Sequence, residues 1–296
     1  MKTQKTSFFD RKEKERMSEL FKRLSKQVAI IIVTVMVLAQ ASAIFPLFQM
    51  LPFSSKVEAA TSIDFENQQW LIDEIIRQVR VTRPLVSDIS EVTTAELQAV
   101  TIINIDSKTL DGNAPGVDGY IPAAINLLPN LTNLSIINTN LTGSIPSTIS
   151  SLTKLQVLDL HGNNLNGSIP SGITSLTNLT YLSLASNKLT GALPAAVLSS
   201  SFAKVVTLDL SDNQLSGPLP DPASAMTALK TLNLSYNQFV GFSSTSALPT
   251  NFTMTRFPAM TSVNISHNPL NAPWNNAFTA SSSVLQNIDL SYCRIN

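Results

Sequence analysis

This chain of 296 residues contains little cysteine and little histidine, and it has no surplus of charge of either sign. The one cysteine, Cys293, excludes an internal disulfide framework and any metal site built from several cysteines. Two histidines leave little material for histidine-based catalysis. Lysine plus arginine number 20, as do aspartate plus glutamate, so the chain lacks the basic surplus of a nucleic-acid-binding protein.

The charge is unevenly distributed along the chain. Residues 1–59 hold 10 basic and 5 acidic side chains, which leaves 10 basic and 15 acidic ones, a net charge of −5, in residues 60–296. Residues 28–53 carry no charge, and their unbroken apolar part, residues 28–39, is 12 residues long. A membrane span needs about 20 apolar residues, so this length favours the hydrophobic region of a signal peptide.

Two places match the small-x-small cleavage pattern, one ending at Ala43 and one ending at Ala59. We favour cleavage before Ala60. The alternative is an uncleaved anchor of 26 residues with its basic flank on the cytoplasmic side. In both cases we expect the remainder to be extracellular, secreted or at the cell surface, with membrane contact only through an uncleaved amino-terminal segment.

A pattern with a period of about 24 residues runs through most of the remaining sequence. It recurs from residue 176, upstream from residue 128, and downstream from residues 202, 226, 257 and 285, with a degenerate unit from residue 97. The unit that starts at residue 152 shows the shared positions, which are Leu152, Leu155, Leu158, Leu160, Asn163, Leu165, Gly167, Ile169 and Pro170.

This template is identified as that of the leucine-rich repeat, and its Gly-x-Ile-Pro ending resembles the plant-type subclass. The resemblance implies an α/β fold, a curved, right-handed solenoid with a parallel sheet on its concave face. Leu158 and Leu160 then point inward from one strand, and stacked units bury them together. Asn163 is expected to satisfy backbone groups of adjacent turns, and Pro170 suits an irregular back of the coil.

Residues 60–96 follow a different pattern. Phe65, Trp70, Leu71, Ile75, Ile76 and Val79 lie at helical spacing, and Thr93 is a candidate N-cap of a second, short helix. This segment resembles the helical cap of internalin-like bacterial surface proteins, which implies a bacterial source. We therefore predict three parts: an export segment at 1–59, a helical cap at 60–96, and repeats at 97–296, the last of them incomplete.

The outward strand positions are polar, mildly acidic and rich in hydroxyl groups, which predicts recognition of a protein or glycan partner at the concave face. Tyr181, Tyr236, His161 and Tyr292 are the candidate anchors, because aromatic side chains dominate many interfaces. We expect Asp159→Ala to weaken binding without a large loss of stability. The predicted partner-binding residues are Asp159, His161, Tyr181, Ser183, Asp209, Ser211, Asn233, Tyr236 and Asn264.

Other interpretations of the repeats remain open. The array could be a wall-associated spacer without a ligand, or a fragment of a receptor ectodomain. The insertions at residues 111–118 and 243–255 would form edge loops, which in solenoids often carry function. The sequence ends without a capping element after the last unit, which predicts a truncated product or an end that docks another subunit.

No catalytic motif accompanies the repeats. A phosphate-binding loop and a His-Glu-x-x-His motif are both absent from the sequence. His161 and His267 lie four units apart, roughly 20 Å at about 4.8 Å per strand, too far to share a metal ion. We therefore expect no enzyme activity, no cofactor, no metal site and no nucleic-acid partner.

Overall fold

The computed structural model describes residue 65 and residues 68–106, 118–220, 224–242, 255–270 and 284–293. The predicted export segment, both of its cleavage sites and most of the two edge loops lie outside the described residues. Among the helices that are described, none combines the length and the apolar character needed to cross a bilayer.

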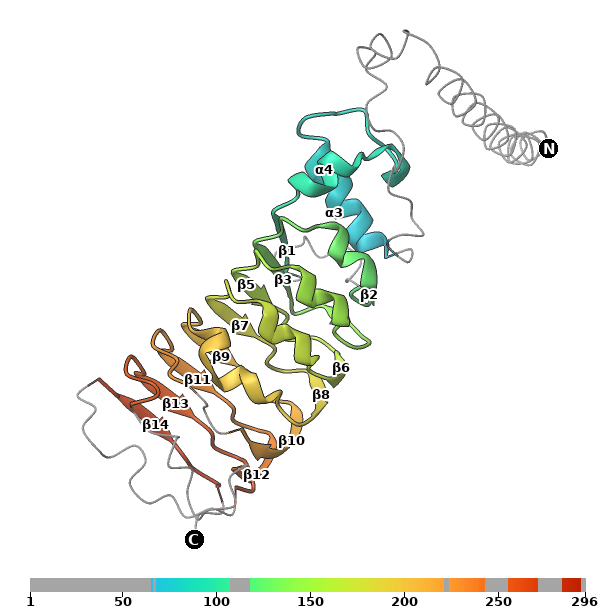
Figure 1. Ribbon diagram of the computed structural model, residues 1–296. Coiled ribbons are helices and arrows are strands. Elements are labelled where there is room, and N and C mark those ends of the chain that lie inside the picture. Colours follow the sequence, from blue (N-terminus) through green and yellow to red (C-terminus); the bar gives the residue numbers. More distant parts are fainter. Residues whose placement is uncertain are drawn as a thin grey trace, which may run out of the picture. The chain divides into compact units, whose positions relative to one another are not determined.

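Short parallel strands form the main sheet, in which neighbours along the chain are neighbours in space. Figure 1 shows them side by side, from green to red. Leu158 pairs with Leu134 on one side and with Leu182 on the other, so equivalent residues of successive units stand in register. This arrangement confirms the predicted α/β leucine-rich repeat solenoid. The eight strands are β1 (Ile102–Asp106), β3 (Asn133–Ile137), β5 (Val157–Asp159), β7 (Tyr181–Ser183), β9 (Thr207–Asp209), β11 (Thr231–Asn233), β13 (Ser262–Asn264) and β14 (Asn287–Asp289).

The interior of the coil is filled by the leucines of the template. Leu152, Leu155, Leu158 and Leu160 are all fully buried, as predicted from their spacing. Burial of a leucine side chain contributes about 1.5–3 kcal/mol. No unit could shelter this many apolar groups alone, so the stability of each coil depends on its neighbours.

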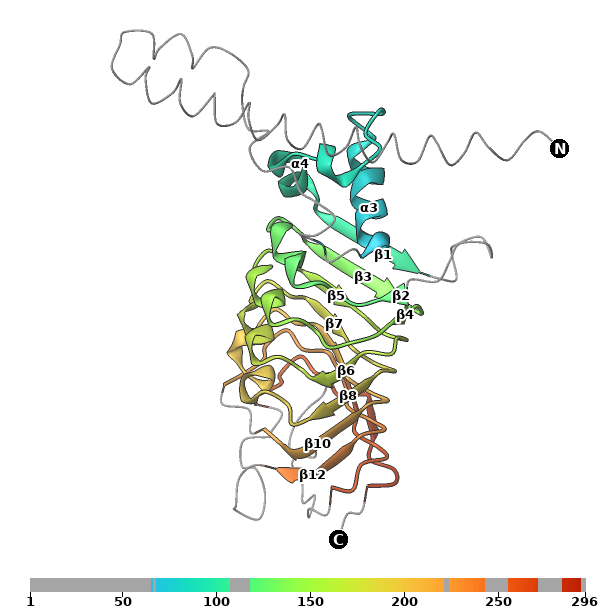
Figure 2. The same cartoon turned by 90° about the vertical axis from the view of Figure 1, so that its right-hand side faces the viewer.

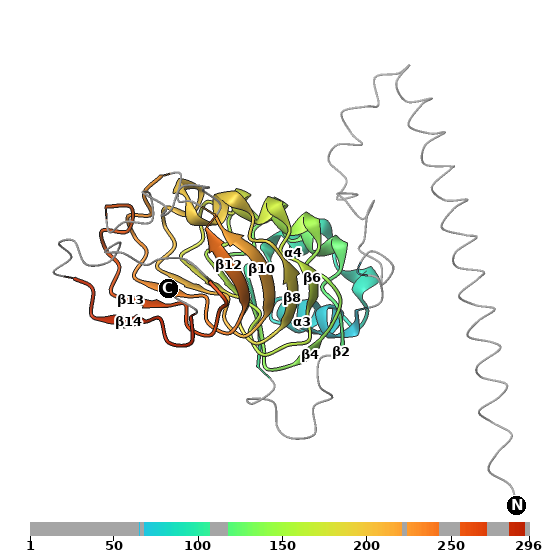
Figure 3. The same ribbon diagram turned by 90° about the horizontal axis from the view of Figure 1, so that it is seen from below.

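Short 3₁₀ helices, not irregular chain, form another side of the coil. Figure 3 shows them along one side and strands β13 and β14 along the opposite side. A proline directly precedes four of them, and three of these prolines, among them Pro170 before η5, have an extended backbone. Proline has no N–H, so at this position it removes one of the donors that would have no partner within the helix. The helices are η3 (Ala123–Leu127), η4 (Ser147–Ser151), η5 (Ser171–Ser175), η6 (Ala195–Leu198) and η7 (Ser200–Phe202).

Two smaller sheets, which the repeat template did not predict, lie between the main strands and these helices along the chain (Figure 2). Gly167, the template glycine in β6, has φ of 73°, and a Cβ there would lie 3.3 Å from Cβ of Ser144 in the preceding coil. Glycine is therefore needed for both the left-handed backbone and the close approach. One sheet contains β6 (Asn166–Ser168), β8 (Lys188–Gly191), β10 (Gln214–Leu219) and β12 (Gln238–Phe242), and the other contains β2 (Asp118–Gly119) and β4 (Asn140–Leu141).

Among the described residues, two α-helices precede the first coil, α3 (Gln69–Val79) and α4 (Thr94–Ala99), with the 3₁₀ helix η2 (Ile89–Glu91) between them. Thr93 is the N-cap of α4, as predicted, and forms a capping box with Glu96. Phe65 is buried but lies before α3 rather than within it. The Gln78 amide donates to the carbonyl of Ile102 at 2.5 Å, so α3 contacts β1 directly.

Candidate functional site

The surface expected to bind a partner is formed by the outward side chains of the main sheet and is called here the strand face. The strand registers divide it into two rows, and none of the described positions in either row is a lysine or an arginine. The first row contains Ile102, Asn133, Val157, Tyr181, Thr207, Thr231, Ser262 and Asn287. The second row contains Asn104, Ser135, Asp159, Ser183, Asp209, Asn233, Asn264 and Asp289.

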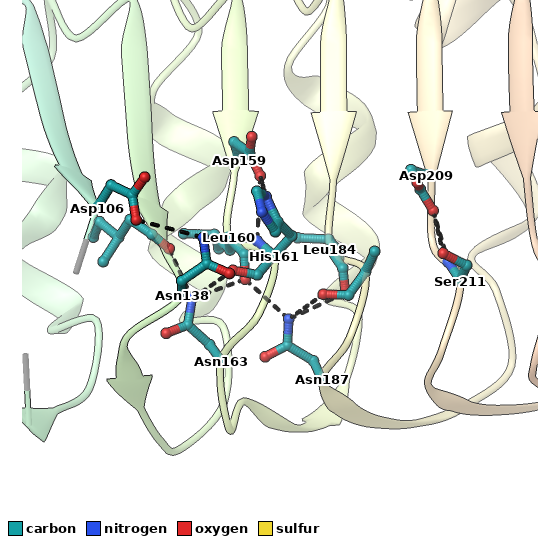
Figure 4. A network of polar contacts seen from close by, with 12 residues as sticks. Asp106, Asn138, Asp159, Leu160, His161, Asn163, Leu184, Asn187, Asp209 and Ser211 are labelled. Atoms are coloured by element: carbon teal, nitrogen blue, oxygen red, sulfur yellow. Dashed lines mark hydrogen bonds and ion pairs between the residues drawn. The ribbon is translucent and has the colours of Figure 1, made fainter. Parts of the chain in front are cut away.

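Side chains of the second row are engaged in turns that close the strands. The Asp159 carboxylate accepts from the backbone N–H of His161 at 3.2 Å and lies 2.7 Å from Nδ1 of its ring. Asp209 accepts from the backbone N–H and hydroxyl of Ser211 at 3.0 and 2.6 Å, and both pairs are visible in Figure 4. Such Asx turns replace backbone hydrogen bonds that end with the strand.

The same turn recurs further along the second row, built from an amide instead of a carboxylate. Asn233 accepts from the backbone N–H and hydroxyl of Ser235 at 3.2 and 2.8 Å. Asn264 accepts in the same way from Ser266 at 3.0 and 2.8 Å. The predicted site residues Asp159, Asp209, Asn233 and Asn264 therefore have a structural role, whatever they contact outside the chain.

The template asparagines form a second polar network, inside the coil (Figure 4). The Asn187 amide donates to the carbonyls of Leu160 and Leu184 at 2.9 and 3.1 Å, and its oxygen accepts from the backbone N–H of Leu165 at 2.9 Å. Asn163, Asn213, Asn237 and Asn268 bridge adjacent coils in the same manner. The predicted role of these asparagines is confirmed.

Cys293 occupies the asparagine position of the last described coil. Its thiol donates to the carbonyl of Ile265 in the preceding coil at 3.1 Å, as the amides do elsewhere. Burial raises the pKa of the Cys293 thiol, and the nearby Asp289 carboxylate adds to this effect. The thiol therefore stays protonated and unreactive, in agreement with a structural role.

Tyr181 lies at the centre of the predicted site. Desolvation raises the pKa of its phenol above the usual value, and the negative charges of Asp159 and Asp209 act in the same direction, while a hydrogen bond with Ser183 opposes them. The strands that carry the two aspartates pair with β7 on its two sides. Ser183 itself is only 3% exposed, so we remove it from the set of side chains available to a partner.

A third row follows the strand ends, one residue before the template asparagines, and is called here the left-handed row. Six of its members have φ between 53° and 55° although they are not glycine, a conformation that bulky residues rarely adopt. Tyr236 and Tyr292 are 55% and 78% exposed. The six are Asn138, Ser186, Asp212, Tyr236, His267 and Tyr292.

The structure brings most of the predicted residues together. Asp159, His161, Tyr181, Asp209 and Ser211 gather over three adjacent strands. Asn233 and Asn264 continue the second row, whereas Tyr236 belongs to the left-handed row. Sequence reasoning missed Asp212 and His267, although their place directly before an asparagine of the template could have identified them.

The described residues include no group of three or more histidine, cysteine, aspartate or glutamate side chains positioned to hold a metal ion. The Asp159 carboxylate lies 2.7 Å from Nδ1 of His161, and the Asp159 side chain is 14% exposed. Because this carboxylate already serves the turn at the end of β5, the pair is better suited to fix the surface than to perform acid–base chemistry.

Comparison with known families identifies the same repeat. A family model described as "Leucine rich repeat" matches residues 129–189, and a second leucine-rich repeat model matches residues 204–226 and 228–252. A search of curated proteins finds no match.

Several solved structures are similar to this chain. A TDR receptor is 34% identical, with 60% of this chain and 29% of that chain covered and a TM-score of 0.54. The plant peptide hormone receptor RGFR1, in complex with RGF2, is 28% identical, with coverage of 67% and 29% and a TM-score of 0.56. PEPR1 in its AtPEP1 structure is 28% identical, with coverage of 60% and 24% and a TM-score of 0.53. The chain thus spans less than a third of each receptor chain.

Proposed function

Because this chain is a leucine-rich repeat protein whose units resemble the plant-type subclass, we propose that it is a recognition domain that binds a peptide or protein partner through the strand face. The proposal includes no catalysis: the strand face offers a binding surface, and its acidic groups serve turns. The similar receptors support a peptide over a glycan, since one is described as a peptide hormone receptor in complex with RGF2.

The observation that carries the proposal is the position of Tyr181 between two carboxylates on adjacent strands. Its phenol is half-buried against Ser183, with Asp159 and Asp209 beside it, so one aromatic group and two charges converge over three coils. Strands about 4.8 Å apart let one extended ligand contact each coil in turn. Aromatic anchors within a polar surround are typical of the residues that dominate interface energies.

We propose further that the strand face is extracellular. The basic amino-terminal residues followed by the uncharged stretch at 28–53 favour export, and the similarity to receptors for peptide hormones supports a ligand that arrives from outside the cell. Removal of residues 1–59 before Ala60 remains our prediction for the secreted form.

A structural spacer is the second candidate. The internal hydrogen bonds of Asp159, Asp209, Asn233 and Asn264 favour it, because side chains that satisfy one another need no ligand. The two candidates differ in one respect: a spacer has no use for the half-buried phenol of Tyr181, whereas a receptor depends on it.

The test is a selection of displayed random peptides on the full chain, followed by titration of the enriched peptides. We expect Tyr181→Ala to weaken their binding at least tenfold and Lys188→Ala, an exposed change in β8, to alter it less than twofold. Enriched peptides that bind both variants equally would move the site away from Tyr181. A selection that enriches nothing would favour the spacer.

A further inference from the structure

A pocket lies beside the exposed stack of aromatic rings in the left-handed row. The ring of His267 covers one face of Tyr236, with centroids 4.0 Å apart and planes inclined by 11°. Beside Tyr236, toward the preceding coil, is a shallow cavity of about 380 Å³, lined by Ser211, Asp212, Ser235 and Tyr236. An aromatic wall and a carboxylate thus border one space large enough for a single side chain.

The polar groups of this pocket are not equally available. The hydroxyls of Ser211 and Ser235 donate to Asp209 and Asn233, so their remaining capacity is to accept. The Asp212 side chain is exposed and has no hydrogen bond or ion pair within the described part of the chain. The two serine oxygens and the Asp212 carboxylate therefore remain open as acceptors, which suits a ligand rich in hydrogen-bond donors.

The charge of the surrounding surface has the same sign. The strands of the main sheet carry Asp106, Asp159, Asp209 and Asp289 but no lysine or arginine at any described position. A surface with charges of one sign attracts ligands of the opposite sign and raises their rate of association. The ligand that this pocket fits is a cation.

We propose that the pocket between Asp212 and Tyr236 binds the guanidinium group of an arginine in a peptide partner. The inference rests on the proposed function, because it assigns a chemistry to the partner of the strand face. Arginine fits better than lysine, since its planar group stacks on an aromatic ring while its N–H groups reach a carboxylate and serine oxygens. Tyr236 supplies the ring, Asp212 the charge, and Ser211 and Ser235 the further acceptors.

The experiment is an NMR titration of the full chain with the acetylated and amidated peptide Gly-Ser-Arg-Ser-Gly. The same peptide with citrulline, which has the shape of arginine without its charge, is the comparison. We expect the arginine peptide to shift the Tyr236 ring signals in a saturable way and the citrulline peptide to bind at least fivefold more weakly. Equal affinity for the two peptides would overturn the inference.

Substitutions test whether the arginine peptide binds in the pocket between Asp212 and Tyr236. Asp212→Asn and Tyr236→Asn should each weaken the arginine peptide at least fivefold, and both keep a residue that tolerates the left-handed backbone. Tyr292→Asn is the matched control at the far end of the stack and should change the affinity less than twofold. An Asp212→Asn variant that binds like wild type would overturn the inference.

The inference and the proposed function fail separately. If selected peptides depend on Tyr181 but the arginine peptide does not bind, the pocket assignment is wrong and the recognition function stands. If no displayed peptide is enriched and the arginine peptide also fails to bind, both are wrong.

Discussion

The imidazole of His267 stacks on the phenol of Tyr236, with ring centroids 4.0 Å apart and planes inclined by 11°. The phenol of Tyr292 covers the other face of the His267 imidazole, with ring centroids 4.3 Å apart. All three residues have φ of 53° to 55°, which costs about 1–3 kcal/mol for residues other than glycine. Each stacked ring pair contributes about 0.5–1.5 kcal/mol of stabilisation. Stacking therefore offsets part of the backbone strain at these three residues.

A double-mutant cycle tests this coupling. Tyr236→Asn and His267→Asn each remove a ring but relieve the backbone strain, so we expect each to change the free energy of unfolding by less than about 1 kcal/mol. The two together should show a coupling of about 0.5–1.5 kcal/mol in urea unfolding. Tyr236→Asn combined with the distant, exposed Lys188→Ala serves as the additive control, and equal coupling in both cycles would contradict the stabilising role of the stack.

We expect the asparagine network to contribute more to stability than the aromatic stack does. Asn237 is 6% exposed, donates to the carbonyl of Leu210 at 2.9 Å and accepts from the N–H of Leu215 at 3.0 Å. Asn237→Ala leaves these buried groups unpaired, so we expect a loss of about 2–4 kcal/mol in chemical unfolding. Asn166→Ala, at an exposed position in β6, is the control and should stay within about 0.5 kcal/mol of wild type. Similar values for the two variants would contradict the structural role.

The repeat template predicted the strands, the leucine core and the asparagine network, because each depends on a residue type at a fixed spacing. It did not predict the left-handed row. Ser186, Asp212 and Tyr236 share one backbone conformation but no chemical property, so nothing in their side chains reveals it. The path of the coil sets the conformation there, and local preference does not.

Two substitutions of Asp159 distinguish the effect of its turn on stability from the effect of its charge. The sequence predicts no large loss of stability for Asp159→Ala, and the structure adds that the carboxylate closes the turn after β5 through the backbone N–H of His161. We expect Asp159→Ala to cost about 1 kcal/mol, while Asp159→Asn keeps an acceptor and stays close to wild type in thermal unfolding. Equal losses for the two substitutions would show that the charge, not the turn, is what stabilises.

The titration of Tyr181 reports on the same carboxylates. Its pKa is raised in the folded state, so its contribution to stability is fully present below about pH 10 and is lost as the pH rises through the folded pKa. In tyrosinate absorbance, measured as the difference from Tyr181→Phe, we expect a midpoint above 10. Asp159→Asn removes one of the negative charges and should lower the midpoint. A midpoint at or below 10 in wild type would contradict the position of Tyr181 beside the aspartates.

The cap of α4 gives a test in the helical segment. The backbone N–H of Glu96 donates to the Thr93 hydroxyl at 3.3 Å, and the Glu96 carboxylate accepts from the backbone N–H of Thr93 at 2.8 Å. Thr93→Ala should cost about 1 kcal/mol, while Thr93→Ser keeps the hydroxyl and most of the stability. Thermal unfolding of the two variants measures the difference, and identical midpoints would contradict the capping role.

The candidate site was less predictable than the fold. The alternation along each strand identified which side chains face outward, but not that Ser183 is covered or that Asp209 is bound to Ser211. These facts depend on distances between side chains of adjacent coils. A pattern along one chain reports which way a residue points, and it does not report what its neighbours leave uncovered.

The asparagines reach back to the preceding coil and not forward: Asn213 donates to the carbonyl of Leu184 and accepts from the N–H of Leu189, 24 positions earlier. A duplicated unit would therefore meet the partners it needs on any coil of the same pattern. Unequal crossing-over in the gene could lengthen or shorten the array by whole units without loss of these bonds. Units of different length also keep them, because the bond from the backbone N–H to the asparagine oxygen spans 22 positions at Asn187, 24 at Asn213 and 29 at Asn268. Over generations, the span of the strand face can change independently of its chemistry.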